Sequence, residues 1–147
     1  MALGVSMALA GGEGRATEVG SRPVPFSASV VPDSSTGWDI VVLRYQDAGD
    51  PGRTLEARVA PAAGANLYSF QVGDEELLKQ PANLAELTDQ GSGTPILFPT
   101  PNRVRNAKME FDGRSFSFPA NAQSNFIHGL VRKRPWQTGP LKSGAAA

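Results

Sequence analysis

The fold is decided by one apolar stretch and by its continuation across a turn. The stretch reads Trp38-Asp39-Ile40-Val41-Val42-Leu43-Arg44-Tyr45, and the continuation reads Thr54-Leu55-Glu56-Ala57-Arg58-Val59. The first is rich in β-branched and aromatic residues, and the second alternates apolar with polar residues as a half-solvated strand does. Residues 47–52 between them carry the Asp, Gly and Pro of a turn. The pattern predicts an antiparallel hairpin.

Downstream sequence extends the β pattern. Residues 65–72 alternate again, and Gly73-Asp74 turns the chain into residues 75–79. The only helix that we predict covers residues 83–89, two turns at most, with Asn83 as its N-cap. The fold class that follows is all-β and antiparallel.

Residues 108–118 predict a second hairpin, because Asp112-Gly113 is a type I′ turn signal between two alternating segments. With these two residues as the loop, Phe111 pairs with Arg114. That register brings four apolar side chains onto one face, which we expect to be buried: Met109, Phe111, Phe116 and Phe118.

Composition bounds the class of protein. The 147 residues suit one domain, and 16 Gly with 12 Pro indicate a folded, loop-rich chain. The chain has no Cys and one His, which excludes a disulfide framework, a thiol nucleophile and a multi-histidine zinc site within it. No apolar run reaches the roughly 18 residues of a membrane span.

Charge is balanced overall but unevenly distributed. Residues 1–100 carry 12 acidic and 6 basic groups, whereas residues 101–147 carry 2 acidic and 8 basic groups. An anionic partner is one interpretation, but we favour mutual neutralisation across one folded surface. The triplet Arg132-Lys133-Arg134 lacks interleaved aromatic residues, so we interpret it as a solvated loop and expect no nucleic-acid partner.

The ends are expected to lie outside the folded part. Residues 1–35 are predicted to be a disordered or signal-like segment, whose short apolar run lacks a basic flank. Residues 36–138 form the predicted domain, and residues 139–147 are predicted to be an unstructured tail. A cytoplasmic location is favoured, with export open if the start is the remnant of a signal peptide.

Residues 93–105 could carry chemistry. A short apolar strand is predicted to end at Pro99 and Pro101, directly before Asn102-Arg103. Prolines form a rigid platform that can hold a guanidinium, but a sheet corner with Arg103 in a structural ion pair is an equal alternative. Residues 91–94 could bind phosphate through backbone amides, although a plain turn is favoured.

Residues 125–132, followed by Pro135-Trp136, form the second such stretch. His128 lies among apolar residues and precedes Gly129, which permits close approach of a backbone or ligand. On pattern alone, a histidine with satisfied hydrogen bonds in the core is favoured over a ligand-binding one. Trp136 fits either a core position, which is the commoner case, or a sugar-stacking surface.

Together these blocks resemble the aldose 1-epimerase, or galactose mutarotase, family. The resemblance rests on the order of residues 93–103, 111–116 and 125–132 with Pro135-Trp136, supported by residues 64–70, and covers residues 38–137. It implies an antiparallel β-sandwich, the galactose mutarotase-like supersandwich, which is incomplete in this chain. It also implies interconversion of the α and β anomers of hexoses by acid–base ring opening, with no metal and no cofactor expected.

The resemblance carries over to individual residues. Arg103 matches the family's sugar-binding Arg, and His128 matches its first active-site His, so we expect His128 to be catalytic and both to bind the sugar. Asn102 and Asn125 are expected to position them as further substrate-binding residues. The family's second His, its substrate-binding Asp and its catalytic Glu belong to sequence beyond this chain. A truncated and nearly inactive isomerase is therefore expected.

Other interpretations stay open. The chain could be a non-catalytic carbohydrate-binding β-sandwich, or an unstable remnant with exposed strand edges. A sugar phosphate could replace the free hexose as substrate, because the last third is basic. The expected partner is a monosaccharide, with no membrane partner. The oligomeric state is open.

Overall fold

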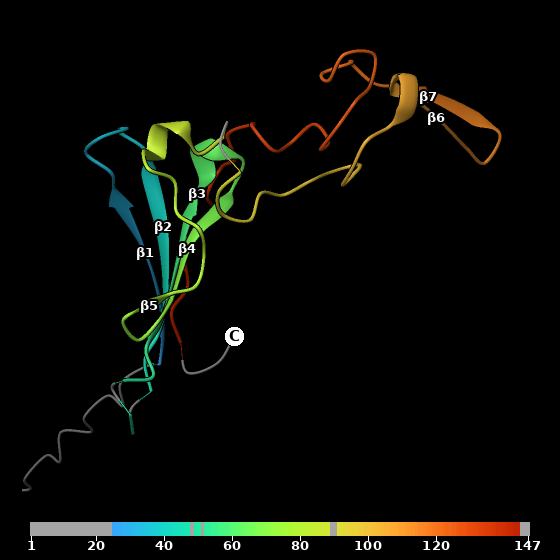
Figure 1. The fold of residues 1–147 in the computed structure, drawn as a ribbon. Coiled ribbons are helices and arrows are strands. Elements are labelled where there is room, and N and C mark those ends of the chain that lie inside the picture. The colour runs from blue at the N-terminus through green and yellow to red at the C-terminus, as the bar shows by residue number, and fades with distance from the viewer. Residues whose placement is uncertain (1–24, 48, 51, 89–90, 145–147) are drawn as a thin grey trace, which may run out of the picture.

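A five-stranded antiparallel sheet is the body of the molecule (Figure 1). The computed structural model describes residues 25–47, 49–50, 52–88 and 91–144. The strands lie side by side in chain order: β1 Phe26–Pro32, β2 Asp39–Tyr45, β3 Leu55–Ala60, β4 Asn66–Val72 and β5 Glu75–Glu76. The predicted all-β class is therefore confirmed.

The predicted hairpin is the centre of this sheet. β2 and β3 are antiparallel and pair from Val41 with Val59 to Tyr45 with Leu55. On the other side of β3, the register to β4 shifts at a bulge between Arg58 and Val59. Because side chains alternate along a strand, the β2–β3 register assigns alternate side chains of these two strands to the same face.

One face of the sheet carries the core. Its buried cluster consists of Ile40, Val42, Ala60, Ala63 and Leu87. Two short 3-10 helices, η1 Pro61–Ala63 and η2 Leu84–Glu86, each supply a residue that contacts this cluster. The predicted helix over residues 83–89 is only η2. Its cap was predicted correctly, since the Asn83 side chain accepts a hydrogen bond from the Ala85 amide at 3.0 Å.

The opposite face is apolar and open. Phe26, Leu43, Leu55, Ala57 and Phe70 line a hollow of about 700 Å³ on it. Phe26 and Leu43 are each 44% exposed. Within the described residues, no second sheet packs on the five-stranded one.

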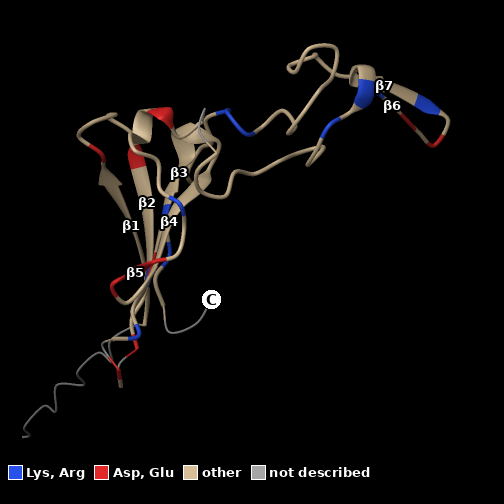
Figure 2. Cartoon of the chain, in the orientation of Figure 1, with Lys and Arg blue, Asp and Glu red and all other residues tan. Residues whose placement is uncertain are grey.

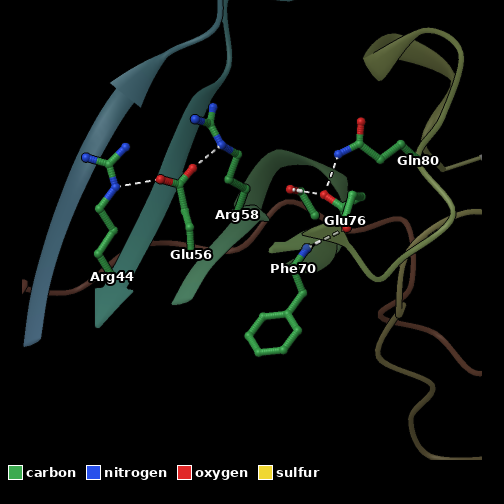
Figure 3. A network of polar contacts seen from close by, with 7 residues as sticks. Arg44, Glu56, Arg58, Phe70, Glu76 and Gln80 are labelled. Atoms are coloured by element: carbon green, nitrogen blue, oxygen red, sulfur yellow. Dashed lines mark hydrogen bonds and ion pairs between the residues drawn. The ribbon is translucent and has the colours of Figure 1, made fainter. Parts of the chain in front are cut away.

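A buried carboxylate holds two arginines on neighbouring strands of the sheet (Figure 3). Glu56 on β3 accepts from Nε of Arg44 at 2.5 Å and from Nε of Arg58 at 2.6 Å. Burial favours a higher pKa of this carboxyl, but the hydrogen bonds and charges of the two arginines outweigh burial and lower the pKa. The ion pair of Glu56 with Arg44 joins β3 to β2.

Glu76 on β5 is held in a similar way (Figure 3). It accepts from the Ser69 hydroxyl and the Gln80 amide, each at 2.6 Å, and from the backbone amide of Phe70 at 2.9 Å. Burial opposes its charge, yet these hydrogen bonds lower its pKa to about 2. Glu76 is therefore an ionised carboxylate, and its hydrogen bonds to Ser69 and Phe70 hold β5 against β4 at the edge of the sheet.

Residues 95–131 leave the sheet as a two-legged extension, which we call the arm (Figure 1). Its legs are joined by backbone hydrogen bonds at three levels. Leu130 donates to Phe98 at 2.6 Å, Val104 and Phe126 exchange two bonds at 2.7 and 3.1 Å, and Phe118 donates to Ala107 at 2.9 Å. The tip is formed by η3 Arg105–Ala107, β6 Lys108–Phe111 and β7 Arg114–Ser117.

The hairpin at the tip has the predicted register, with Phe111 opposite Arg114 and Met109 opposite Phe116. The predicted burial of its apolar face is wrong, because every residue of β6 and β7 is exposed and Phe111 is 70% exposed. No other layer of the described chain lies against this end of the arm (Figure 1). The Phe118 ring stacks on that of Phe126, with ring centroids 4.7 Å apart.

Both ends of the described chain differ from expectation. β1 lies within the segment predicted to be disordered, and residues 1–24 of that segment lie outside the described residues. The predicted tail also contacts the sheet, because Gly144 and Phe26 exchange hydrogen bonds of 3.2 and 3.1 Å. An edge strand has free backbone groups, and the tail satisfies some of those on β1. No helix in the described part has the length and apolarity to cross a bilayer.

Candidate functional site

His128 lies on the returning leg of the arm, in a sharply turned backbone. Asn121 holds Ile127, the residue before His128. The Asn121 side chain donates to the Ile127 carbonyl at 3.0 Å and accepts from the Ile127 amide at 2.8 Å. His128 has a φ of 62°, in the left-handed region that few non-glycine residues adopt. The surrounding hydrogen bonds therefore hold the imidazole in a defined place.

Gly129 shows why this turn forms. Its φ is 71°, and a Cβ added there would lie 2.1 Å from the Phe98 carbonyl oxygen. Only glycine allows this approach, which lets the next amide, that of Leu130, reach the same carbonyl. The sequence predicted close approach of a backbone or a ligand, and the structure shows a backbone.

A cationic cavity adjoins the imidazole. His128 is half-buried and lines a cavity of about 420 Å³ with Asn121, Phe126, Leu130, Arg132 and Lys133. Nη1 of Arg132 lies 3.1 Å from Nδ1 of His128, and Nη2 of Arg132 donates to the Thr88 carbonyl at 3.4 Å. The lining residues include no acidic side chain. The expectation of a core histidine is therefore wrong, because the ring borders a cavity.

Arg103 lies on the outgoing leg, one residue before the pairing of Val104 with Phe126. This pairing brings the Asn-Arg and His-Gly motifs to neighbouring positions on the two legs. The Arg103 side chain is exposed and does not line the cavity beside His128. Among the described residues no carboxylate forms an ion pair with it, so the described part of the chain offers no support for a structural ion pair.

The two asparagines act on the backbone in this structure. The Asn102 side chain accepts from the Arg103 amide at 2.8 Å, and the Asn125 side chain accepts from the Asn106 amide at 3.1 Å. Asn125 thus links the two legs next to the Val104 pairing. Both shape the backbone around the predicted site residues, and no contact to the Arg103 or His128 side chain is made by either amide.

Other predicted features resolve into structural roles. The apolar strand before Pro99 is not formed, and its start makes one isolated bridge between Thr94 and Leu67. Residues 91–94 are bent and do not form a hydrogen-bonded turn, because the Gly93 and Thr94 amides donate to the distant carbonyls of Lys79 and Leu67. Trp136 is 43% exposed, which excludes a core position, and lines a hollow of about 590 Å³.

Arg132 is the residue that the sequence interpretation missed. It was assigned to a solvated loop, yet its guanidinium contacts His128 and the Thr88 carbonyl. Its spacing of four residues from His128 was the available signal. The arm also carries the basic groups Arg103, Arg105, Lys108 and Arg114, with its acidic residues confined to the tip (Figure 2).

Known proteins similar to this chain were found in three ways. A family model described as aldose 1-epimerase matches residues 52–146, so the similarity begins and ends later than the 38–137 expected. An uncharacterized protein of Escherichia coli (strain K12), YihR, is 35% identical over 77 residues, which cover 41% of this chain and 25% of the relative. A crystal structure of galactose 1-epimerase from Lactobacillus acidophilus NCFM superposes with a TM-score of 0.53 at 18% identity. It covers 76% of this chain and 33% of its own, so the chain spans about a third of that protein.

Proposed function

This chain belongs to the aldose 1-epimerase family, and on that premise we propose that it forms part of a site that interconverts the α and β anomers of a hexose. The observation that carries the proposal is the backbone pairing of Val104 with Phe126. It brings Arg103 and His128, the residues that match the family's motifs, to adjacent positions on two legs that are far apart in sequence.

Arg103 and His128 would act on the sugar by hydrogen bonding. A guanidinium donates to hydroxyl oxygens through five N–H groups, and an imidazole can donate to the ring oxygen. Ring opening also needs a base that takes the proton of the anomeric hydroxyl. We assign no residue of this chain to that base, and the substrate could equally carry a phosphate.

The proposal therefore separates binding from turnover. We expect the chain alone to bind galactose or glucose and to exchange the anomers no faster than buffer does. Saturation-transfer NMR measures binding, and exchange spectroscopy of the two anomeric protons measures turnover. His128→Ala and Arg103→Ala should each weaken binding roughly 10-fold or more, as loss of a hydrogen bond to a charged or ring donor does. Arg134→Ala, an exposed neighbour, is the control.

A chimera distinguishes an epimerase from a binding module. This chain would replace the matching third of the Lactobacillus galactose 1-epimerase, so that the rest of that enzyme is present beside it. Turnover that depends on His128 supports the epimerase assignment. A folded chimera that binds sugar without exchanging its anomers supports the carbohydrate-binding alternative. Absence of saturable binding in the chain and in the chimera would overturn both.

A further inference from the structure

The contact between Arg132 and His128 has a consequence for the chemistry of the ring. An arginine is always protonated and has no acceptor atom, so its Nη1 can only donate. At 3.1 Å from Nη1, the imidazole Nδ1 must therefore accept. A nitrogen that accepts carries no proton, so the proton of the neutral ring lies on Nε2.

We propose that Arg132 is a positioning residue that fixes His128 in the Nε2–H tautomer. This rests on the proposed function, in which His128 donates a hydrogen bond to a sugar oxygen. With Nδ1 occupied by Arg132, Nε2–H is the one donor that the neutral ring offers to a ligand in the cavity.

Three features keep the pair in this arrangement. Arg132 is itself anchored, because Nη2 donates to the Thr88 carbonyl at 3.4 Å. Its backbone is fixed as well, since the Arg132 carbonyl packs where a Cβ of Gly64 would lie. His128 is held by the clamped Ile127 before it and by Gly129 against Phe98 after it. Both partners are therefore placed independently of any ligand.

The single histidine of the chain makes the proposal directly measurable. Long-range proton–nitrogen NMR of the uniformly 15N-labelled full chain at about pH 8, where histidines are usually neutral, gives signals from one imidazole only. We expect the pattern of a single Nε2–H tautomer, with Nδ1 unprotonated. A protonated Nδ1 on the neutral ring would overturn the proposal, whatever the chain's affinity for sugar.

Substitutions test whether Arg132 is the cause. Arg132→Met keeps most of the aliphatic stem but removes the donor, and should give an exchange-averaged mixture of tautomers. Arg132→Lys retains a charged donor and should restore the single tautomer at least in part. Arg134→Met, two residues away and exposed, is the matched control and should leave the spectrum unchanged. Identical spectra for the wild type and Arg132→Met, with both folded by their backbone spectra, would overturn the proposal.

Sugar titrations of the same variants connect the tautomer to binding. Arg132→Met should bind galactose up to about 2-fold more weakly, because only the Nε2–H fraction of the mixed tautomers can donate to the sugar, and Arg132→Lys should recover part of the loss. If the tautomer is as proposed and the wild type binds no sugar, the proposed function fails and the positioning role stands. If sugar binds and Nδ1 is protonated, only the positioning role fails.

Discussion

The β2–β3 hairpin of the sheet and the hairpin at the tip of the arm are both predicted by local sequence, yet only the first has an apolar face that is buried. Ile40 on β2 is 3% exposed, whereas Phe116 on β7 is 40% exposed, although both strands lie in hairpins that their sequences predict. Alternation and turn chemistry are local, and they determine which strands pair. Burial depends on a second layer, which the sheet receives from η1 and η2 and the tip does not.

The largest expected effect tests this contrast directly. Ile40→Ala removes a side chain from the buried cluster and should lower the free energy of unfolding by about 2–5 kcal/mol. Phe116→Ala removes a larger but exposed side chain and should cost under about 1 kcal/mol. Urea unfolding followed by circular dichroism measures both. Comparable losses of unfolding free energy in the two variants would mean that the tip is covered in solution, and would contradict the difference in burial between the sheet and the tip.

The junction between the two regions should be next in sensitivity. Gly64 precedes β4, and its Cβ would lie 1.9 Å from the carbonyl oxygen of Arg132 at the base of the arm. Gly113 has a similar φ, 67° against 74°, and open space around it. Gly113→Ala should therefore cost only the strain of a left-handed alanine, about 1 kcal/mol. Gly64→Ala should cost about 1–3 kcal/mol more.

Hydrogen exchange distinguishes a local from a global effect at this junction. In Gly64→Ala we expect faster exchange of the Trp136 amide, which donates to the Pro61 carbonyl next to Gly64. The amides shared by β2 and β3 should keep their protection. Equal behaviour of the two glycine variants would argue against the close contact between Gly64 and Arg132.

The smallest expected effect is on the pH dependence of stability, and it arises from Glu76 in the sheet. The pKa of Glu76 is about 2 in the folded protein against 4.5 ordinarily, so its contribution is full above pH 4.5 and is lost as the pH falls towards 2. Glu76→Gln should lower stability at neutral pH by about 1 kcal/mol, allowing for solvent screening of this partly exposed group. The stability of this variant should also fall less steeply between these pH values. A stability profile for Glu76→Gln that runs parallel to that of the wild type between these pH values would contradict the assignment.

The sequence predicted the local parts of the fold and missed what depends on distant partners. The β2–β3 pairing, the Asp112-Gly113 turn and the Asn83 cap are set by residues within a few positions of each other. β1 was missed because its sequence, with Ser and Ala between its apolar residues, is a weak strand signal until β2 lies beside it.

The site was predicted by its motifs and not by its contacts. His128 and Arg103 were chosen from the order of the motifs, and the pairing of Val104 with Phe126 brings their two segments side by side. Their roles in binding sugar stay a prediction. The order of the motifs does not predict which side chains contact one another. The meeting of Arg132 with His128 depends on the left-handed turn at His128 and Gly129, which in turn depends on the distant backbone of Phe98.

The pairing of Phe26 with Gly144 makes the path of the chain close on itself. The piece before the arm is the sheet, and the piece after it is held to that sheet by Trp136 at Pro61 and by Gly144 at Phe26. A protease nick at the Asp112-Gly113 turn would therefore yield two fragments that stay together under native conditions and part only on denaturation. The chain on both sides of the arm is held at the sheet, so a cut at the far end of the arm does not release either fragment.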